Sequence, residues 1–251
     1  MKPKVSIITV CYNSAKTIED TIQSVVNQTY DNIEYIVIDG VSTDNTLEII
    51  NKYKNQITTI ICEKDKGIYD AINKGIGIAT GDIIANLNSD DFYIDNNVIA
   101  DVVATFEKEK TDTLYGDLYY VDAVDTNKIV RYWKSKKYKE GLFLKGWMPP
   151  HPTFFVKKKV YQKHGLFNLQ FKSAADYEIM LRFIHRFKTS IAYLPRVVVK
   201  MRVGGVSNAS LSNRIKANKE DRRAWEVNGL KPTAFTLIFK PLSKILQFIK
   251  K

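Results

Sequence analysis

The first half of the chain alternates two hydrophobic periods, and this alternation restricts the fold more than any other feature of the sequence. Short runs rich in Val and Ile, typical of strands buried on both faces, occur at Lys4–Val10, Ile33–Asp39, Ile57–Cys62 and Asp82–Leu87. Segments with apolar residues at helical spacing lie between them, at Ala15–Gln28, Thr43–Tyr53 and Ile68–Ala79. This order predicts an α/β fold: a mostly parallel sheet with helices on both faces and ligands at the carboxyl ends of its strands.

The second half of the chain has no such regular alternation. Strands are expected at Thr113–Val121, Lys128–Trp133 and within Ser190–Val203, and helices at Asp95–Glu109, Val156–His164, Ala174–Arg186 and Ser210–Asn228. The stretch from Lys136 to Pro152 is loop-like, because it contains two glycines and a pair of prolines. Ser14 and Ser42 precede the first two helices and are candidate N-caps. We expect one mixed α/β domain with a C-terminal appendage.

Composition and charge narrow the possible partners. The chain has 251 residues, of which 45% are hydrophobic and 26% charged, as is typical of a globular protein with a sizeable core. Its formal net charge of +11 favours an anionic partner, and nucleic acid, nucleotide phosphates and anionic lipid all remain open. No stretch reaches the roughly 18 uncharged apolar residues of a spanning helix, so an integral membrane protein is not expected.

Two features bear on the compartment. Cys11 and Cys62 lie singly in apolar runs and offer neither zinc-ligand spacing nor a disulfide framework, which favours a reducing cytoplasm. The start of the chain, MKPKVSIITVCYN, has the basic beginning and short apolar run of a signal peptide. The run ends at Tyr12-Asn13 without a small-residue cleavage site, so a first strand is the better interpretation.

Polar residues follow each of the four strands expected in the first half. They are Tyr12-Asn13, Asp39–Asp44, Glu63–Gly67 and Asn88–Asp91. Because the carboxyl ends of parallel strands meet at one edge of a sheet, we expect these four sets to lie together. Asn, Asp and Gly are also turn formers, and a turn would be the simpler explanation of any one loop. Four such loops at one edge favour a ligand site.

Asp90 and Asp91 are adjacent carboxylates at the end of the fourth strand. Two like charges repel unless a cation or strong donors stabilise them. A hard divalent cation, Mg²⁺ or Mn²⁺, binds carboxylates together with substrate phosphates and makes a diphosphate a better leaving group. The alternative is that the pair caps the helix expected at Asp95–Glu109, where acids are favourable. These two residues alone do not decide between the two roles.

Five segments together point to a known family. They are VSIITVCYN, IDGVSTDNT, EKDKGIYDAINKG, GDIIANLNSDD and AADYEIMLRF. In this order they resemble family 2 glycosyltransferases of the GT-A fold, and especially bacterial enzymes that assemble O-antigen, capsule or exopolysaccharide. The resemblance runs from Lys4 to Ser207. It implies a GT-A domain at 1–208, with a nucleotide-binding half at about 1–110 and an acceptor-side half at about 111–208, followed by C-terminal helices at 209–251.

The resemblance implies inverting transfer of a sugar from a nucleotide-sugar donor, expected to be a UDP-sugar, to a saccharide or polyprenyl-linked saccharide. The aspartate-any-aspartate motif of the family falls on Asn88-Ser89-Asp90, with Asp91 following. Asn88 stands where the first acid is usual. Asp90 and Asp91 are therefore the implied ligands of Mn²⁺ or Mg²⁺, with Asn88 a neutral contributor. A catalytically silent relative that binds a nucleotide sugar or a saccharide is the alternative.

Other positions match the donor site of the family. They are Thr9, Tyr12, Asn13, Asp39, Asp65 and Asn73. The first three match the strand end that holds the nucleotide base, Asp39 matches the acid that bonds the base edge, and Asp65 lies near ribose and base. Asn73 matches the second member of an Arg-Asn pair, but Ile72 stands where arginine is common, which removes one cation near the phosphates.

On the acceptor side, the resemblance implies that Asp176 is the general base for the incoming hydroxyl. Capping of the following helix is the structural alternative for this residue. Glu178 is two residues further on and would point elsewhere. His151 matches a histidine near the donor phosphates or the acceptor. Trp147 is expected either to stack on a sugar ring or to fill the core, and Arg202 to meet a phosphate beside a mobile loop.

The C-terminal segment Thr233–Lys251 is apolar and basic. From Leu242 onward its apolar residues recur at helical spacing, with lysines opposite. Such a helix can lie on an anionic membrane, which would place the protein on the cytoplasmic face of the inner membrane. Packing on the domain itself or on a second subunit is the alternative, and the oligomeric state is left open.

Two other classes of protein are less consistent with the sequence. A dinucleotide-binding oxidoreductase would need a glycine-rich turn after the first strand, and Cys11-Tyr12-Asn13-Ser14 offers none. A nucleic-acid-binding protein would suit the net charge, but the chain has no zinc-finger or RNP-type motif. Its strand-end loops are acidic where a phosphate-tracking groove would be basic. Nucleic acid is therefore not an expected partner.

Overall fold

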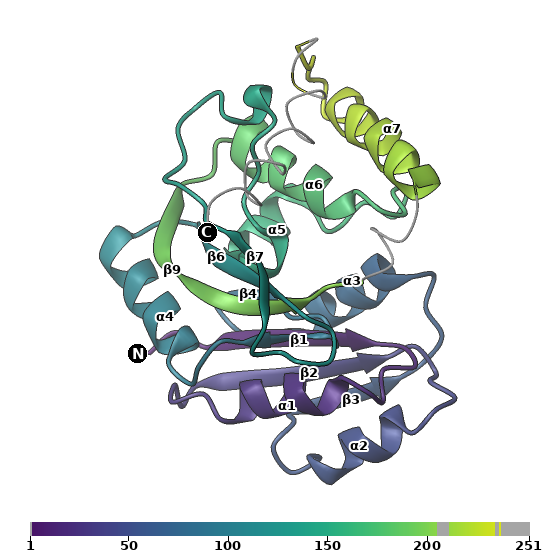
Figure 1. Cartoon of the computed structure of the whole chain (residues 1–251). Coiled ribbons are helices and arrows are strands. Elements are labelled where there is room, and N and C mark those ends of the chain that lie inside the picture. The colour runs from purple at the N-terminus through teal and green to yellow at the C-terminus, as the bar shows by residue number, and fades with distance from the viewer. Residues whose placement is uncertain (1, 205–210, 234–235, 237–251) are drawn as a thin grey trace.

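The computed structural model describes residues 2–204, 211–233 and 236 and shows a curled mixed sheet between layers of helices (Figure 1). The strands are β1 Val5–Cys11, β2 Ile33–Asp39, β3 Thr59–Cys62, β4 Ile83–Asn86, β5 Asp91–Tyr93, β6 Thr113–Val121, β7 Ile129–Trp133, β8 Phe155–Lys157 and β9 Ile191–Arg202. Their order in the sheet is β3-β2-β1-β4-β8-β6-β9-β5, and β7 pairs with β6.

Helices connect and cover these strands. The α-helices are α1 Ile18–Val26, α2 Thr46–Lys52, α3 Ile68–Ile78, α4 Val98–Glu109, α5 Lys158–His164, α6 Ala175–Met180 and α7 Leu211–Val227. Two short 3₁₀ helices, η1 Phe143–Lys145 and η2 His151–Thr153, precede β8, and a π-helical turn, η3 Leu181–Arg186, extends α6.

The first four strands form one parallel part of the sheet, and β6 and β9 form a second parallel pair. β1 pairs in parallel with β2 and β4, and β2 pairs in parallel with β3. Every residue of β1 is buried, as its Val- and Ile-rich sequence predicts. The register places Cys11 opposite Asp39 and Asp39 opposite Cys62, so three strands end at the same level. The expected parallel α/β arrangement of the first half is therefore confirmed.

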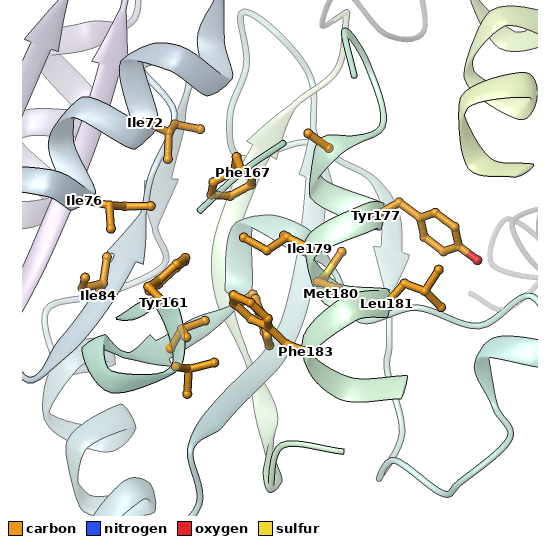
Figure 2. Close-up of a cluster of buried hydrophobic side chains, with 14 of the residues drawn as sticks. Ile72, Ile76, Ile84, Tyr161, Phe167, Tyr177, Ile179, Met180, Leu181 and Phe183 are labelled. Carbon is orange, nitrogen blue, oxygen red and sulfur yellow. The ribbon is translucent and has the colours of Figure 1, made fainter. Parts of the chain in front are cut away.

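Alternate residues of each strand enter two hydrophobic clusters. Ile7 and Val37 face the cluster that contains α1, α2 and α4, and Ile8 and Ile36 face the cluster that contains α3, α5 and α6. Figure 2 shows part of the second cluster, built from α3, α5, α6 and the strand β4. Each fully buried Val or Ile contributes about 1.5–3 kcal/mol, so this two-sided burial is the main source of stability.

Gly75 explains how closely α3 lies on the sheet. A Cβ atom at this position would lie 2.5 Å from Cγ2 of Ile8 on β1. Any larger residue would force the helix away from the strand. The helix is continuous from Ile68 to Ile78 although glycine lowers helix propensity, because packing against the sheet compensates for it.

Three expectations about local structure are wrong. The segment expected to be helical from Val156 begins as strand β8, which pairs with β4, and α5 begins only at Lys158. Ser14 and Ser42 do not cap α1 and α2. The N-cap residues are Thr17 and Asn45, and neither helix has a side-chain capping bond. The Ser14 hydroxyl bonds instead to the Ser89 hydroxyl, and the Ser42 hydroxyl donates to Asp39 at the end of β2.

The C-terminal helix α7 packs against α6. Trp225 is fully buried, and its Nε1 donates to the Tyr177 hydroxyl at 2.9 Å. Nδ2 of Asn228 donates to Glu178 Oε1 at 2.9 Å, and Glu178 also pairs with Arg182 at 3.0 Å. Glu178 thus points away from Asp176, as expected. Within the described residues, none of the helices combines the length and apolar character needed to cross a bilayer.

Candidate active site

The loops that follow β1 to β4 contact one another, as the sequence predicts. Oδ1 of Asn13 accepts the Thr43 backbone N–H at 2.8 Å, which joins the first two loops. The Ser14 and Ser89 hydroxyls are 2.8 Å apart, which joins the first loop to the fourth. The backbone N–H of Glu63 donates to the Asp39 carbonyl at 3.0 Å. The expected polar edge of the sheet is therefore one connected surface.

Asp39 is fully buried at this edge, and four groups donate to its carboxylate. Oδ1 accepts the Ser42 hydroxyl at 2.5 Å and the Cys11 thiol at 3.5 Å, and Oδ2 accepts the Ser42 backbone N–H at 2.9 Å and the Cys62 thiol at 3.2 Å. Burial, and then Asp39, raises the pKa of Cys11, and the hydrogen bond to Asp39 raises the pKa of Cys62. Both thiols therefore stay protonated and orient the carboxylate. The sequence interpretation missed these two donors.

Gly40 lies against the Asp65 carboxylate. A Cβ atom at Gly40 would lie 2.6 Å from Asp65 Oδ2, so any larger residue would require that carboxylate to shift. Oδ1 of Asp65 accepts the Gly67 backbone N–H at 2.8 Å. Tyr12, directly after β1, is 60% exposed. Tyr12, Asp39 and Asp65 thus lie at or just after the ends of β1, β2 and β3, the strand ends that the resemblance assigns to the nucleotide base.

Two of the residues matched to the donor site, Thr9 and Asn73, form hydrogen bonds with other residues of the protein. Thr9 is fully buried and accepts the Tyr35 hydroxyl at 3.2 Å. The Asn73 amide is bonded at both ends to the backbone of Phe167: Nδ2 donates to the carbonyl and Oδ1 accepts the N–H, each at 2.9 Å. This geometry favours a bracing role for Asn73, which joins α3 to the second half of the chain.

Asp91 is the first residue of β5, and its carboxylate is fully buried. Oδ2 accepts from Asn88 Nδ2 at 3.2 Å, whereas the buried Oδ1 has no hydrogen-bond partner among the described residues. Burial and the neighbouring Asp90 raise the pKa of Asp91 well above its usual range, and burial also raises the pKa of Asp90. The helix-cap alternative for this pair is wrong, because α4 starts only at Val98.

Arg202 lies beside this pair at the end of β9. It is buried, and its Nη1 donates to the Asp90 carbonyl at 2.8 Å while Nη2 pairs with Asp20. Its charge also acts to lower the pKa of Asp90 and Asp91. The structure thus brings Arg202 to the predicted metal side. The rest of the loop expected to close over the site, 205–207, lies outside the described residues.

Sheet pairing places two further residues, Tyr120 and Arg131, on the same side of the sheet as Asp91, and the sequence interpretation missed both. Asp91 lies opposite Met201 on β9, Met201 opposite Tyr120 on β6, and Tyr120 opposite Arg131 on β7. Residues aligned across adjacent strands face the same side of a sheet. The Arg131 guanidinium lies 4.4 Å from the centre of the Tyr120 ring. Burial raises the pKa of the Tyr120 hydroxyl, Arg131 lowers it, and Asp91 and Asp176 both raise it.

Asp176 lies in the first turn of α6, on the acceptor side. Its Oδ1 accepts the Tyr69 hydroxyl at 3.4 Å. The cap residue of the helix is Ala174, so Asp176 does not have the expected alternative role of N-cap. Burial lowers the pKa of His151, and the charge of Asp176 opposes this change, so the two side chains share one electrostatic environment.

Trp147 lies among core aromatic residues. Its ring centre is 5.7 Å from Tyr115, 5.6 Å from Tyr138 and 5.7 Å from Phe143. Of the two alternatives for Trp147, these contacts favour filling the core.

The described residues contain no ready-made metal cage. They contain no group of three or more His, Cys, Asp or Glu side chains placed to hold an ion. The unpaired buried oxygen of Asp91, next to Asp90, still suits a hard cation that takes its other ligands from substrate phosphates and water. A hollow of about 670 Å³ at the other end of the sheet is lined by Lys4, Lys110 and Lys157 among others, and includes none of the predicted site residues.

Comparison with known proteins identifies the class to which this fold and site belong. The sequence matches the family described as glycosyl transferase family 2 over residues 6–165, more than half of the chain. A PGL/p-HBAD biosynthesis glycosyltransferase of Mycobacterium bovis is 30% identical over 211 residues, covering 82% of this chain and 80% of the relative. The chain therefore belongs to glycosyltransferase family 2, and the resemblance found in the sequence is confirmed.

A second relative matches only part of the chain. The enzyme WfaP of Escherichia coli is named UDP-Glc:alpha-D-GlcNAc-diphosphoundecaprenol beta-1,3-glucosyltransferase. It is 42% identical over 121 residues, which cover 47% of this chain and 47% of WfaP.

Solved structures confirm the GT-A type of fold. TarS of Staphylococcus aureus, solved with UDP-GlcNAc, has a TM-score of 0.69 at 18% identity. The match covers 90% of this chain but only 65% of the TarS chain, just under two thirds. The mannosyltransferase PcManGT of Pyrobaculum calidifontis, solved with GDP-Man and Mn²⁺, has a TM-score of 0.67 at 18% identity, covering 99% of this chain and 70% of the other. At this identity the likeness shows the fold alone.

Proposed function

We propose that this protein transfers a sugar with inversion from a UDP-sugar to a saccharide or polyprenyl-linked saccharide during synthesis of a bacterial surface polysaccharide. Membership of glycosyltransferase family 2 gives the general activity. The name of WfaP includes both a UDP-sugar donor and a diphosphoundecaprenol-linked acceptor, and TarS was solved with UDP-GlcNAc. These relatives support the finer proposal about donor and acceptor.

The observation that supports it most strongly is the buried, unpaired Oδ1 of Asp91 beside Asp90. A buried carboxylate oxygen without a donor is costly, and a divalent cation is the partner that would stabilise both acids. Asp90 and Asp91 would hold Mn²⁺ or Mg²⁺, with Asn88 as a neutral neighbour. When bound, such an ion neutralises the diphosphate and assists its departure.

Other residues bind and orient the donor. In the proposal, Tyr12, Asn13, Asp39 and Asp65 hold the base and ribose at the ends of β1 to β3. The Asp39 carboxylate is pre-oriented by its four donors, so base binding needs little further ordering. Arg202 adds positive charge beside Asp90.

Asp176 acts as the general base. Its carboxylate takes the proton from the acceptor hydroxyl, whose oxygen forms a bond to the anomeric carbon. The bond from that carbon to the donor phosphate oxygen breaks at the same time, and the nucleoside diphosphate leaves with the electron pair. Attack opposite the leaving group inverts the anomeric centre. His151 borders this region and shares its electrostatic environment with Asp176.

The test is UDP release from UDP-glucose in the presence of GlcNAc-diphosphoundecaprenol, with and without Mn²⁺, extended to other sugar nucleotides. We expect Mn²⁺-dependent turnover and a product of inverted anomeric configuration by NMR. Asp91→Asn should abolish turnover, and Asp176→Asn should stop transfer while UDP still binds. UDP binding without transfer from any donor would instead support a catalytically silent relative, for which the Asn88 departure is the specific reason.

The membrane association expected from the C-terminal segment remains a separate proposal. Residues 237–251, which carry most of its apolar and basic side chains, lie outside the described residues. We place the protein at the cytoplasmic face of the membrane only as part of the proposed use of a lipid-linked acceptor.

A further inference from the structure

We propose that Tyr69 is a positioning residue for Asp176: its hydroxyl holds Oδ1 of the carboxylate and leaves Oδ2 to take the proton of the acceptor. The inference rests on the proposed function, because it assumes that Asp176 is the general base. No feature of the sequence indicated this role. The strand-end loops point to donor binding, and Tyr69 directly follows the third of them, in the first turn of α3.

Tyr69 bridges 107 positions of sequence to reach the predicted base. Its hydroxyl donates to Asp176 Oδ1 at 3.4 Å. This contact joins the first turn of α3 to the first turn of the helix that carries the base.

The Tyr69 ring is itself held in place. It stacks on Phe167, with ring centres 5.6 Å apart and planes 16° apart. Phe167 is fixed through its backbone by the two hydrogen bonds from Asn73, one turn further along α3. Figure 2 shows Phe167 between Ile72 of α3 and Ile179 of α6. The hydroxyl therefore cannot move away from Asp176 without disturbing a packed core.

α7 holds the same helix start from the other side. The Glu220 carboxylate accepts the backbone N–H groups of Lys172 at 3.0 Å and Ser173 at 2.8 Å, just before α6. With Glu220 fixing the chain before Asp176 and Tyr69 fixing the carboxylate, the base has one orientation. A fixed orientation is what a proton acceptor in a bimolecular transfer requires.

Electrostatics keep Tyr69 in the role of donor. Burial, and then the charge of Asp176, raises the pKa of Tyr69 far above the range in which a protein works. The groups that face this pair are His151 on η2, Tyr120 on β6 and Glu220 on α7. The Tyr69 hydroxyl therefore keeps its proton and acts as a donor to the carboxylate.

The experiment compares Tyr69→Phe with Tyr177→Phe as a matched control. Tyr177 lies next to Asp176, but its buried hydroxyl contacts Trp225 on α7. With UDP-glucose and GlcNAc-diphosphoundecaprenol, or the pair turned over fastest in the donor screen, we expect Tyr69→Phe to lower kcat about tenfold, with KM for the donor within about twofold. Tyr177→Phe should leave kcat within about twofold of wild type.

Two further measurements keep the proposal falsifiable. In the Asp176→Asn background, Tyr69→Phe should have almost no additional effect on the residual rate, because its contribution passes through the carboxylate. Independently of turnover, the side-chain ¹³C resonance of Asp176, assigned by its loss in Asp176→Asn, should shift at neutral pH in Tyr69→Phe and stay in place in Tyr177→Phe. An unmoved resonance in Tyr69→Phe, or a kcat within about twofold of wild type with Asp176→Asn inactive, would overturn the inference alone. Full activity of Asp176→Asn would instead overturn the base assignment in the proposed function.

Discussion

Glu34 is a buried carboxylate near the amino ends of β1 and β2, at the opposite end of these strands from the loops of the candidate site. Its Oε2 accepts the Ser6 hydroxyl at 2.5 Å and the Thr80 N–H at 2.7 Å, and its Oε1 accepts the Thr80 hydroxyl at 2.6 Å. Burial alone would raise its pKa, but the donors outweigh burial and lower the pKa below its usual value of 4.5. Glu34 therefore stabilises the fold in its charged form.

We expect Glu34→Gln to lower the free energy of unfolding by about 1–3 kcal/mol at pH 7, because an amide cannot accept all three hydrogen bonds. A carboxyl with a lowered folded-state pKa stabilises above its unfolded-state pKa, and this stabilisation is lost as the pH falls through the folded-state value. The difference in the free energy of unfolding between Glu34→Gln and wild type should thus shrink below about pH 4.5. Urea denaturation at pH 7 and pH 4 measures it, with the exposed Glu109→Gln as control. An equal difference at both pH values would contradict the prediction.

Asn88 offers a second test at a single position. Asn88→Asp restores the first acid of the motif. It also removes the Asn88 amide group that donates a hydrogen bond to Asp91 Oδ2. Without metal, the added charge should lower Tm. With Mn²⁺ and UDP, the rise in Tm should exceed that of wild type, because a third carboxylate strengthens binding of a hard cation. Thermal denaturation with and without Mn²⁺ checks this, with Asn88→Ala as control. An Mn²⁺ effect no larger than that of wild type would count against a metal at this site.

At the scale of elements, α7 is held to α6 chiefly by the buried Trp225. Trp225→Ala should lower the free energy of unfolding by about 3–5 kcal/mol, since it leaves a large cavity. Trp225→Phe keeps most of the ring volume but loses the hydrogen bond to Tyr177. It should therefore lower the free energy of unfolding by less than Trp225→Ala does. Equilibrium denaturation of both variants measures these costs. A loss below about 1 kcal/mol for Trp225→Ala would mean that α7 contributes little to the fold.

Strand prediction worked where burial leaves a long local signal. The bounds expected for β2 and β6 agree with the structure, and β1 and β4 differ by one residue at each end. It failed for β5 and β8, which have three residues each and no periodic pattern of their own. Both form because distant strands, β9 and β4 respectively, supply their hydrogen-bond partners. The sequence immediately around β5 or β8 therefore does not predict that either segment forms a strand.

The site was predictable to a similar extent. The residues at the ends of the first four strands could be named, because strand ends in a parallel sheet must meet. The contacts that orient them could not, since Arg202 reaches Asp90 across 112 positions and Tyr69 reaches Asp176 across 107. The contact that Asn73 makes could not be predicted from its neighbours either, because its partner, the Phe167 backbone, is 94 residues away.

At the scale of the whole molecule, Asn73 joins the two halves of the chain. Asn73→Ala should lower the free energy of unfolding by about 1–3 kcal/mol, because it leaves the buried N–H and C=O of Phe167 without their partner. UDP affinity should stay within about twofold of wild type. Urea denaturation and calorimetric titration with UDP separate the two effects. Unchanged stability with a tenfold loss of UDP affinity would favour the donor-binding role expected from the sequence.

Membrane association is a property of the whole chain and can be tested by truncation. The Thr236 hydroxyl donates to the Leu144 carbonyl at 2.7 Å, so a chain ending at Thr236 keeps this contact. Such a truncation should no longer sediment with phosphatidylglycerol vesicles, whereas the full chain should, because anionic lipid attracts the basic segment. Phosphatidylcholine vesicles serve as control. Equal sedimentation of both proteins would show that the segment is not the anchor.

The pairing of β5 with β9 also restricts how related enzymes can be recombined. The strand that begins with Asp91 belongs to the first half of the sequence, yet its neighbour in the sheet comes from the second half. A hybrid gene joined near residue 110 would place a foreign β9, and with it a foreign Met201 and Arg202, against the native acids. Exchanging acceptor halves to change the product would therefore alter the donor site as well. The useful crossover points in such hybrids are those that keep β5 and β9 from the same parent.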